Sequence, residues 1–254
     1  MTSCNRILRR WIERDRGLGA GASFKMTLSS CIDSVLARSP MFTSFQPAYL
    51  YPESDGKPMV DNTKQYRWVV RLTENLKRLF LDSRNPAFVG TDLFWYPVEG
   101  RSDIVCAPDV FVALGRPAGD RGSYQQWKED QIAPQVVFEV LSPSNTMAEM
   151  AAKQSFYVQY GAAEIYFYNP DTLDFWGFVQ DQDGQPHRLL LPLHLPWTSP
   201  RLGVTFRLGA TELEIVRRDG QLFEDPSVWA NKLDRAMAKL RELGIDPQML
   251  EGEP

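Results

Sequence analysis

The chain has 254 residues, of which 43% are hydrophobic and 24% charged, a composition typical of a globular domain with a sizeable core. Its 28 Lys+Arg and 32 Asp+Glu give a formal net charge of -4, which excludes an overall basic field, so any contact with nucleic acid has to be local. The three cysteines lie far apart, which argues against a disulfide framework and a structural zinc site, and no apolar run reaches the roughly 18 residues of a membrane span. These features predict a cytoplasmic protein without a membrane partner.

The start of the chain, residues 1–43, is predicted to be a poorly ordered basic extension. Six of its first 25 residues are basic and two are acidic, and the glycine-rich residues 17–23 interrupt any helix begun there. Such a segment is typical either of an arm that contacts DNA or of a frayed extension, and the second interpretation is favoured. The main domain is predicted over residues 44–224, followed by a C-terminal helix and tail over residues 225–254.

The first element of this domain is a helix predicted over residues 64–81, because Val69, Leu72 and Leu76 recur at helical spacing. Three strands are predicted next, each rich in β-branched and aromatic residues and bounded by glycine or proline. They fall within residues 87–97, 103–114 and 135–141. The polar insertion at residues 115–134 is long for a connection, and its mixed charges favour a solvated loop.

A second helix is predicted after the third strand, because Thr146 and Glu149 form a capping box and Gly161 suits the C-terminal end. The later strands fall within residues 163–169, 172–180, 188–195, 203–207 and 212–217. A last helix begins at Asp225-Pro226, ends before Gly244 and carries one apolar face. The sequence therefore predicts an α+β (α/β) fold, a mixed central β-sheet flanked by helices with extra C-terminal strands and a C-terminal helix.

Two carboxylates interrupt the predicted buried strands. Glu139 lies within VVFEVL, where almost every neighbour is apolar, so both faces of the strand are expected to be covered. A buried carboxylate has to be compensated by a cation, a metal or a proton. Asp109 follows Pro108 and is likewise an acid among hydrophobic residues, so the two acids are expected to converge from adjacent strands.

Lys153 is the expected third member of this group. It lies fourteen residues after Glu139, and its helical neighbours Met150, Phe156 and Tyr157 place it on the stripe that faces the sheet. Acids of this kind bind a hard divalent ion, while an ammonium orients the attacking water or helps to deprotonate it. The pattern predicts phosphodiester hydrolysis.

The sequence resembles the Uma-type restriction endonucleases, bacterial members of the PD-(D/E)XK nuclease superfamily. The stretches that carry the resemblance are APDVFVALGRP (107–117), RGSYQQWKED (121–130), APQVVFEVLSPSNT (133–146), KQSFYVQYGAAEIYFYNPD (153–171) and SPRLGVTF (199–206). The resemblance implies a restriction-endonuclease-like core of a helix, a three-stranded meander, a second helix and a further strand, with magnesium held by the motif acids. It assigns Asp109 as the motif Asp and Glu139 as the motif (D/E).

One position departs from the family pattern. Leu141 stands two residues after Glu139, where the name-giving motif has lysine, and Lys153 matches the lysine that the superfamily moves to the following helix. Glu74 would match the family's helix-one acid, and Asp92 would supply another ligand or an acid that supports the ligands from behind, although neither lies in a matching motif.

Each residue also has a simpler interpretation. Asp109 would be a turn or capping acid, Glu139 the partner of a nearby arginine, and Lys153 a lysine whose ammonium reaches water past Tyr157. The aromatic side chains of Tyr157, Tyr160 and residues 166–168 are expected to pack in the core. His187 and His194 lack metal-ligand spacing, which argues against a zinc site, and no histidine is positioned for a serine hydrolase.

The leading prediction is an endonuclease dependent on Mg²⁺ or Mn²⁺ that cleaves DNA, with Asp109 and Glu139 as metal ligands and Lys153 as the third catalytic residue. The alternative is a catalytically inactive nuclease-like module that binds nucleic acid or protein. Glycoside hydrolysis by the acid pair ranks far behind. Cleavage of two strands would favour a homodimer.

Overall fold

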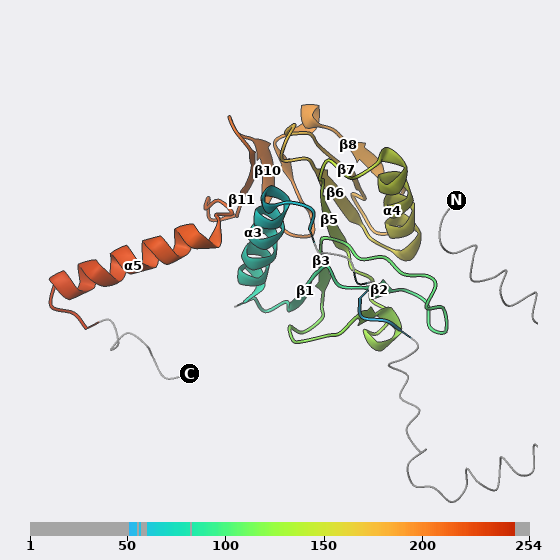
Figure 1. Cartoon of the computed structure of the whole chain (residues 1–254), viewed down its shortest axis with the longest axis horizontal. Coiled ribbons are helices and arrows are strands. Elements are labelled where there is room, and N and C mark those ends of the chain that lie inside the picture. The colour runs from blue at the N-terminus through green and yellow to red at the C-terminus, as the bar shows by residue number, and fades with distance from the viewer. Residues whose placement is uncertain (1–50, 55, 57–59, 82, 247–254) are drawn as a thin grey trace, which may run out of the picture. The chain divides into compact units, whose positions relative to one another are not determined.

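The computed structural model describes residues 51–54, 56, 60–81 and 83–246, all in the larger of the chain's two units, residues 48–254. The basic extension predicted at residues 1–43 lies outside the described residues. The described part has the predicted mixed α+β fold, with helices on both faces of a central sheet (Figure 1).

Six strands form the central sheet in the order β1-β3-β5-β6-β7-β8. β5 and β6 are parallel and are joined by a helix, whereas every other neighbouring pair is antiparallel. The strands are β1 (Ala87–Thr91), β3 (Val110–Leu114), β5 (Val136–Val140), β6 (Glu164–Tyr168), β7 (Phe175–Val179) and β8 (Arg188–Leu190).

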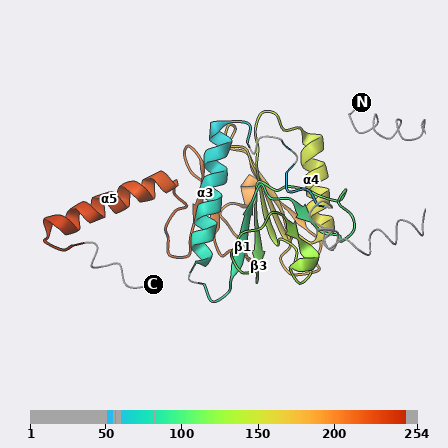
Figure 2. The same ribbon diagram turned by 60° about the horizontal axis from the view of Figure 1, so that its bottom comes forward.

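Two helices cover opposite faces of this sheet, as Figure 2 shows. α3 (Thr63–Phe80) begins at Asn62, whose side chain caps two backbone N–H groups, and α4 (Met147–Tyr160) begins with the predicted capping box of Thr146 and Glu149. Because side chains alternate along a strand, Val136, Phe138 and Val140 pack on the α3 side, while Val137 packs on the α4 side. Glu139 therefore points toward α4.

Smaller elements surround the central sheet. A three-stranded sheet extends the core on the α3 side, and a parallel pair of two-residue strands lies on the α4 side. These strands are β9 (Trp197–Thr198), β10 (Thr205–Leu208) and β11 (Leu213–Val216) in the first, and β2 (Trp95–Tyr96) and β4 (Tyr124–Gln125) in the second. Two short 3-10 helices are η2 (Gln126–Lys128) and η3 (Pro192–His194).

The strand predicted within residues 87–97 is broken in two. Asp92 has a φ of 45°, a left-handed conformation that ends β1 and turns the chain toward β2. The strand predicted from residue 103 begins only at Val110, after Pro108, which supplies no backbone donor for a ladder.

The insertion at residues 115–134 is only partly the solvated loop that its composition favoured, because residues 117–120 are exposed but the later half packs against the domain. Glu129 is only 9% exposed and accepts hydrogen bonds from Arg116 at 2.9 Å and Arg121 at 2.7 Å. Tyr124 is fully buried in the same segment. The mixed charges of this segment form ion pairs with one another, Arg116 and Arg121 with Glu129, and these pairs order the insertion.

The C-terminal helix α5 (Pro226–Glu242) forms where predicted, but none of its residues is buried. Trp229 lies under the Arg78 guanidinium at 5.0 Å, whereas Leu233 is 61% exposed. The predicted apolar face is therefore only partly covered within the described part of the chain. Within the described part of the chain, no helix is both long enough and apolar enough to cross a membrane.

Candidate active site

The register of the central sheet brings the two predicted acids side by side. Val110 pairs with Phe138 across β3 and β5, and the same register continued by one residue places Asp109 opposite Glu139. Both side chains point to the α4 face of the sheet, as Phe111 and Val137 do. The expected convergence follows from strand alternation and an antiparallel pairing.

Glu139 is a buried carboxylate with two close partners. Its side chain is 2% exposed, and its Oε2 accepts a hydrogen bond from the Lys153 ammonium at 2.6 Å. Its Oε1 accepts a hydrogen bond from the Tyr157 hydroxyl at 2.5 Å. Lys153 and Tyr157 lie four residues apart on α4, so one helix face supplies both donors.

Asp109 is bound more loosely. Its Oδ2 accepts a hydrogen bond from the backbone N–H of Val140 at 2.7 Å, and Oδ1 has no partner among the described residues. Burial raises the pKa of Asp109 to about 8, and the negative charge of Glu139 adds to the rise. A carboxyl group with a free oxygen and a raised pKa is suited to a nearby cation.

The ammonium of Lys153 interacts with the charges of both acids. Burial alone would lower the pKa of its ammonium, but the charges of Glu139 and Asp109 outweigh burial and raise that pKa. The ammonium bonds Glu139 while the Lys153 side chain stays 28% exposed, so the simpler interpretation, in which Lys153 only reaches water, leaves out this ion pair. The partner of Glu139 is likewise a lysine and not an arginine.

Asp109 and Lys153 line an open cavity of about 910 Å³. Residues that precede α3, residues of the turn after β1 and residues at the start of α4 complete its walls, among them Asp61, Asp92, Phe94 and Glu149. Glu139 is absent from this lining because its carboxylate is enclosed beneath Lys153 and Tyr157. The acidic walls favour a positive ion over an anion of the same size.

Tyr157 and Gln65 contribute to the site in ways that the sequence did not reveal. Tyr157 was expected to be a core aromatic, and it is fully buried, but its hydroxyl also lies 3.3 Å from the Cys106 sulfur and bonds Glu139. Gln65 donates a hydrogen bond from Nε2 to the Val140 carbonyl at 2.8 Å. The spacing of Tyr157 four residues after Lys153 was a usable signal, whereas the role of Gln65 depends on a contact across 75 residues.

The two acids considered beside the motif take different places. Asp92 lines the cavity, its charge raises the pKa of Asp109 further, and its N–H bonds the Asp109 carbonyl. Glu74 pairs with Lys77 at 3.0 Å on the surface of α3 and lies outside the cavity lining. His187 bonds the Ala162 carbonyl and His194 bonds the Leu191 N–H, so each histidine has a structural role.

The donor set fits a hard divalent ion. The described residues contain no group of three or more His, Cys, Asp or Glu side chains placed to hold a metal, so a closed protein cage is absent there. Mg²⁺ commonly binds through one or two carboxylates and completes its shell with waters and substrate phosphates. Asp109 offers a free Oδ1 beside the cavity, whereas Glu139, enclosed beneath Lys153 and Tyr157, offers only the remaining lone pairs of its two bonded oxygens.

The fold and the grouped side chains define a restriction-endonuclease-like α+β protein: a helix, three antiparallel strands, a second helix and a parallel strand, with two acids at β3 and β5 and a lysine on the second helix. The chain belongs to the Uma2 family, whose profile, described as "Putative restriction endonuclease", matches residues 51–208. The resemblance read from the motifs is thereby confirmed, and membership places the chain among nuclease-like proteins.

One solved structure similar to the chain is described as "a putative nuclease belonging to DUF820 from Anabaena variabilis ATCC 29413". It is 14% identical, has a TM-score of 0.43, and the match covers 59% of this chain and 82% of that chain. No curated protein matches the chain.

Proposed function

We propose that this protein is an endonuclease that hydrolyses DNA phosphodiester bonds with Mg²⁺ or Mn²⁺. The observation that carries the proposal is the convergence of Asp109, Glu139 and Lys153 from two adjacent strands and the following helix. Membership in a nuclease-like family supports the class of reaction.

In this proposal Asp109 and Glu139 hold the ion. The bound ion would stabilise charge on the scissile phosphate and lower the pKa of a water molecule. Lys153 keeps its ammonium against Glu139 and beside Asp109, where it orients the attacking water or offsets phosphate charge. The Tyr157 hydroxyl fixes the orientation of the Glu139 carboxylate through its hydrogen bond, so that the free lone pairs of that carboxylate keep one direction.

Cleavage of plasmid and oligonucleotide DNA in Mg²⁺ or Mn²⁺ tests the proposal. We expect Asp109→Ala to lower the rate by about 100-fold or more, as loss of a group that stabilises transition-state charge does. Glu74→Ala is the matched control, because Glu74 is an acid of the same domain outside the cavity, and this variant should cleave normally. DNA left intact by the unaltered chain in both metals, or full cleavage by Asp109→Ala, would contradict the proposal.

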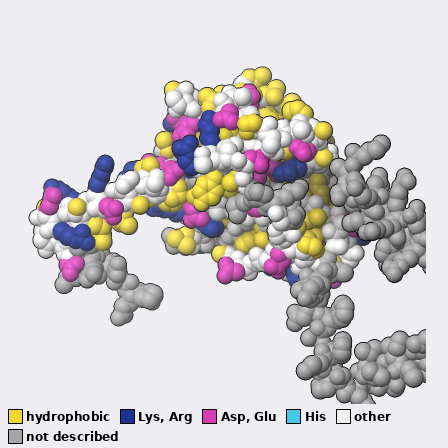
Figure 3. Space-filling model, viewed as in Figure 1, with side chains coloured by type: hydrophobic (Ala, Val, Ile, Leu, Met, Phe, Trp, Pro, Cys, Tyr) yellow, Lys and Arg dark blue, Asp and Glu magenta, His cyan; other side chains and the backbone are white. Residues whose placement is uncertain are grey.

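A nuclease-like module without catalysis is the second candidate. Both oxygens of Glu139 are engaged by protein donors, and the face of the molecule in Figure 3 intersperses basic and acidic side chains without a continuous basic field. Calorimetric titration with Mn²⁺ separates the two candidates. If the protein is an endonuclease, the unaltered chain should bind Mn²⁺ and Glu139→Gln should not. If it is a module without catalysis, the titrations of the unaltered chain and of Glu139→Gln should not differ.

A further inference from the structure

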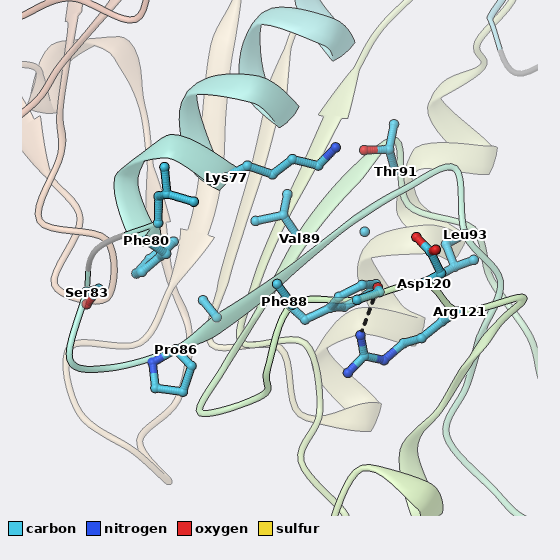
Figure 4. A pocket seen from close by; sticks show the side chains of 15 residues that line it. Lys77, Phe80, Ser83, Pro86, Phe88, Val89, Thr91, Leu93, Asp120 and Arg121 are labelled. Atoms are coloured by element: carbon cyan, nitrogen blue, oxygen red, sulfur yellow. Dashed lines mark hydrogen bonds between the residues drawn. The ribbon is translucent and has the colours of Figure 1, made fainter. Parts of the chain in front are cut away.

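A second cavity, separate from the candidate active site, lies along the free edge of β1. It has a volume of about 580 Å³ and runs between the C-terminal turns of α3 and the loop at residues 118–121 (Figure 4). β1 forms its floor, and β1 is the outermost strand of the six-stranded sheet. An apolar channel with a strand edge as its floor is the shape that an extended peptide fits.

The backbone of β1 offers unused hydrogen-bonding groups to this channel. Gly115 donates to the Pro86 carbonyl and Asp92 donates to the Asp109 carbonyl, so alternate residues from Pro86 to Asp92 turn their backbone groups toward β3. The N–H and C=O groups of the residues between them therefore point into the channel, and they have no partner among the described residues. Those residues are Ala87, Val89 and Thr91.

These free groups are poorly solvated. Ala87 is 7% exposed and Val89 is 8% exposed, because the walls of the channel enclose the strand. Unpaired backbone groups in such a place cost free energy that a paired strand recovers. β1 also lacks the charged side chain or bulge with which natural edge strands discourage pairing.

The charged side chains of the lining indicate what kind of strand fits: Lys77 lies on the α3 wall, and Asp120 and Arg121 lie on the opposite wall, where Arg121 pairs with Glu129. Lys77 extends along the α3 wall with its ammonium toward Thr91, above the side of β1 that carries Val89 (Figure 4). Its side chain is 54% exposed and its partner is Glu74 on the same helix. Around the twofold axis of a β1–β1 pair, two Lys77 side chains would approach each other and repel, which disfavours a second copy of the chain.

We propose that this channel, defined by β1, the end of α3 and residues 118–121, binds an extended peptide of a partner protein that adds antiparallel to β1. The partner's central residue is acidic, pairs with Val89 and points to Lys77, because cross-strand partners share one face. Its two neighbours are apolar and face Phe88, Leu93 and the stem of Arg121 on the opposite wall. This inference does not depend on the proposed nuclease activity.

A labelled, capped peptide of sequence KTVDVTK tests the proposal with the full chain by fluorescence anisotropy. We expect saturable binding that weakens by roughly tenfold in Lys77→Glu, because an attractive surface charge pair becomes repulsive. Lys64→Glu is the matched control: it makes the same charge change on the same helix, but Lys64 lies outside the channel lining and its variant should bind normally.

The hydrogen-bond register is tested by N-methylation of the peptide. Methylation of the central aspartate nitrogen removes a bond to Val89 and should abolish binding, whereas methylation of either valine nitrogen should leave binding unchanged. No saturable binding up to about 1 mM, a value that corresponds to a very weak complex, would overturn the proposal. Equal losses in Lys64→Glu and Lys77→Glu, or indifference to the methylated position, would also overturn it.

Sedimentation of the chain without peptide tests whether a second copy of the chain occupies the channel instead. We expect no self-association that depends on β1. A dimer that Val89→Pro dissociates, since proline removes the outward N–H, would show that a second copy covers the edge and would overturn the partner proposal.

Discussion

At the scale of single residues, Glu139 shows how a buried charge is kept in this fold. Its carboxylate is 2% exposed and is compensated by one cation and one hydroxyl, Lys153 and Tyr157. The desolvation cost of such a charge is large, and only complete hydrogen bonding offsets it. The pair therefore contributes less to stability than its short distance suggests, which points to a role in function.

Because Lys153 compensates the buried charge of Glu139, the stability losses of variants at these two residues should not be additive. Lys153→Met leaves the Glu139 charge uncompensated and should lower the free energy of unfolding by about 3 kcal/mol. The double variant with Glu139→Gln should lose at least about 1 kcal/mol less than the sum of the single losses, measured by urea unfolding. Lys77→Met, which breaks only the exposed pair with Glu74, should change stability by about 0.5 kcal/mol or less. Strictly additive losses would show that Lys153 and Glu139 are not coupled.

Asp109 should behave in the opposite way. Burial beside Glu139 raises the pKa of Asp109, so the folded state without an ion is penalised for its charge. Asp109→Asn keeps an acceptor for the Val140 N–H and removes that penalty, so we expect a gain of about 1 kcal/mol in stability near pH 8. The same variant should lose DNA cleavage. A thermal melt that shows destabilisation would contradict this account of the charge.

At the scale of elements, the sequence was informative where signals were local. The helical spacing of Val69, Leu72 and Leu76 and the capping box at Thr146 placed α3 and α4 within a residue or two. Strand alternation was enough to expect Asp109 and Glu139 on one face. The break at Asp92 was missed because a left-handed φ at an aspartate has no specific sequence signal, and the ordering of residues 115–134 was missed because its ion pairs join residues 8 and 13 positions apart.

The strand β6 carries a second buried acid that joins the central sheet to the small sheet. Glu164 is fully buried and accepts hydrogen bonds from the Tyr166 hydroxyl at 2.9 Å, the Ser199 hydroxyl at 2.5 Å and the Arg201 N–H at 3.0 Å. Burial raises the pKa of Glu164 above its ordinary 4.5, although these bonds lower it in part. This acid fixes the turn that precedes β10.

The raised pKa gives the stability a defined pH dependence. Because the folded state holds the proton of Glu164 more tightly than the unfolded chain, the stabilisation is complete below pH 4.5 and is lost as the pH rises through the folded pKa. Glu164→Gln does not titrate, so the unaltered chain should lose stability relative to this variant between pH 4 and pH 7. Melting curves of both proteins across that range measure the difference, and a constant difference would contradict the assignment.

At the scale of the whole molecule, the candidate site and the β1 channel occupy different places around one sheet. The first cavity opens where β3 and β5 meet α4, and the second follows the outer edge of β1 beside α3. A net charge of -4 excludes an overall basic field, and the face shown in Figure 3 intersperses basic and acidic side chains, so attraction to DNA has to be local, as at the proposed ion. The metal is therefore central to the proposed activity.

The claim that Asp109 and Glu139 bind a divalent ion is tested by a crystal structure of the chain soaked with Mn²⁺, with anomalous scattering recorded at the manganese edge. We expect one strong peak in contact with the carboxylates of Asp109 and Glu139, and no peak there in Asp109→Ala crystals grown in the same way. Crystals in which manganese binds elsewhere, or in which Lys153 and Tyr157 keep Glu139 closed and no ion enters, would contradict the account.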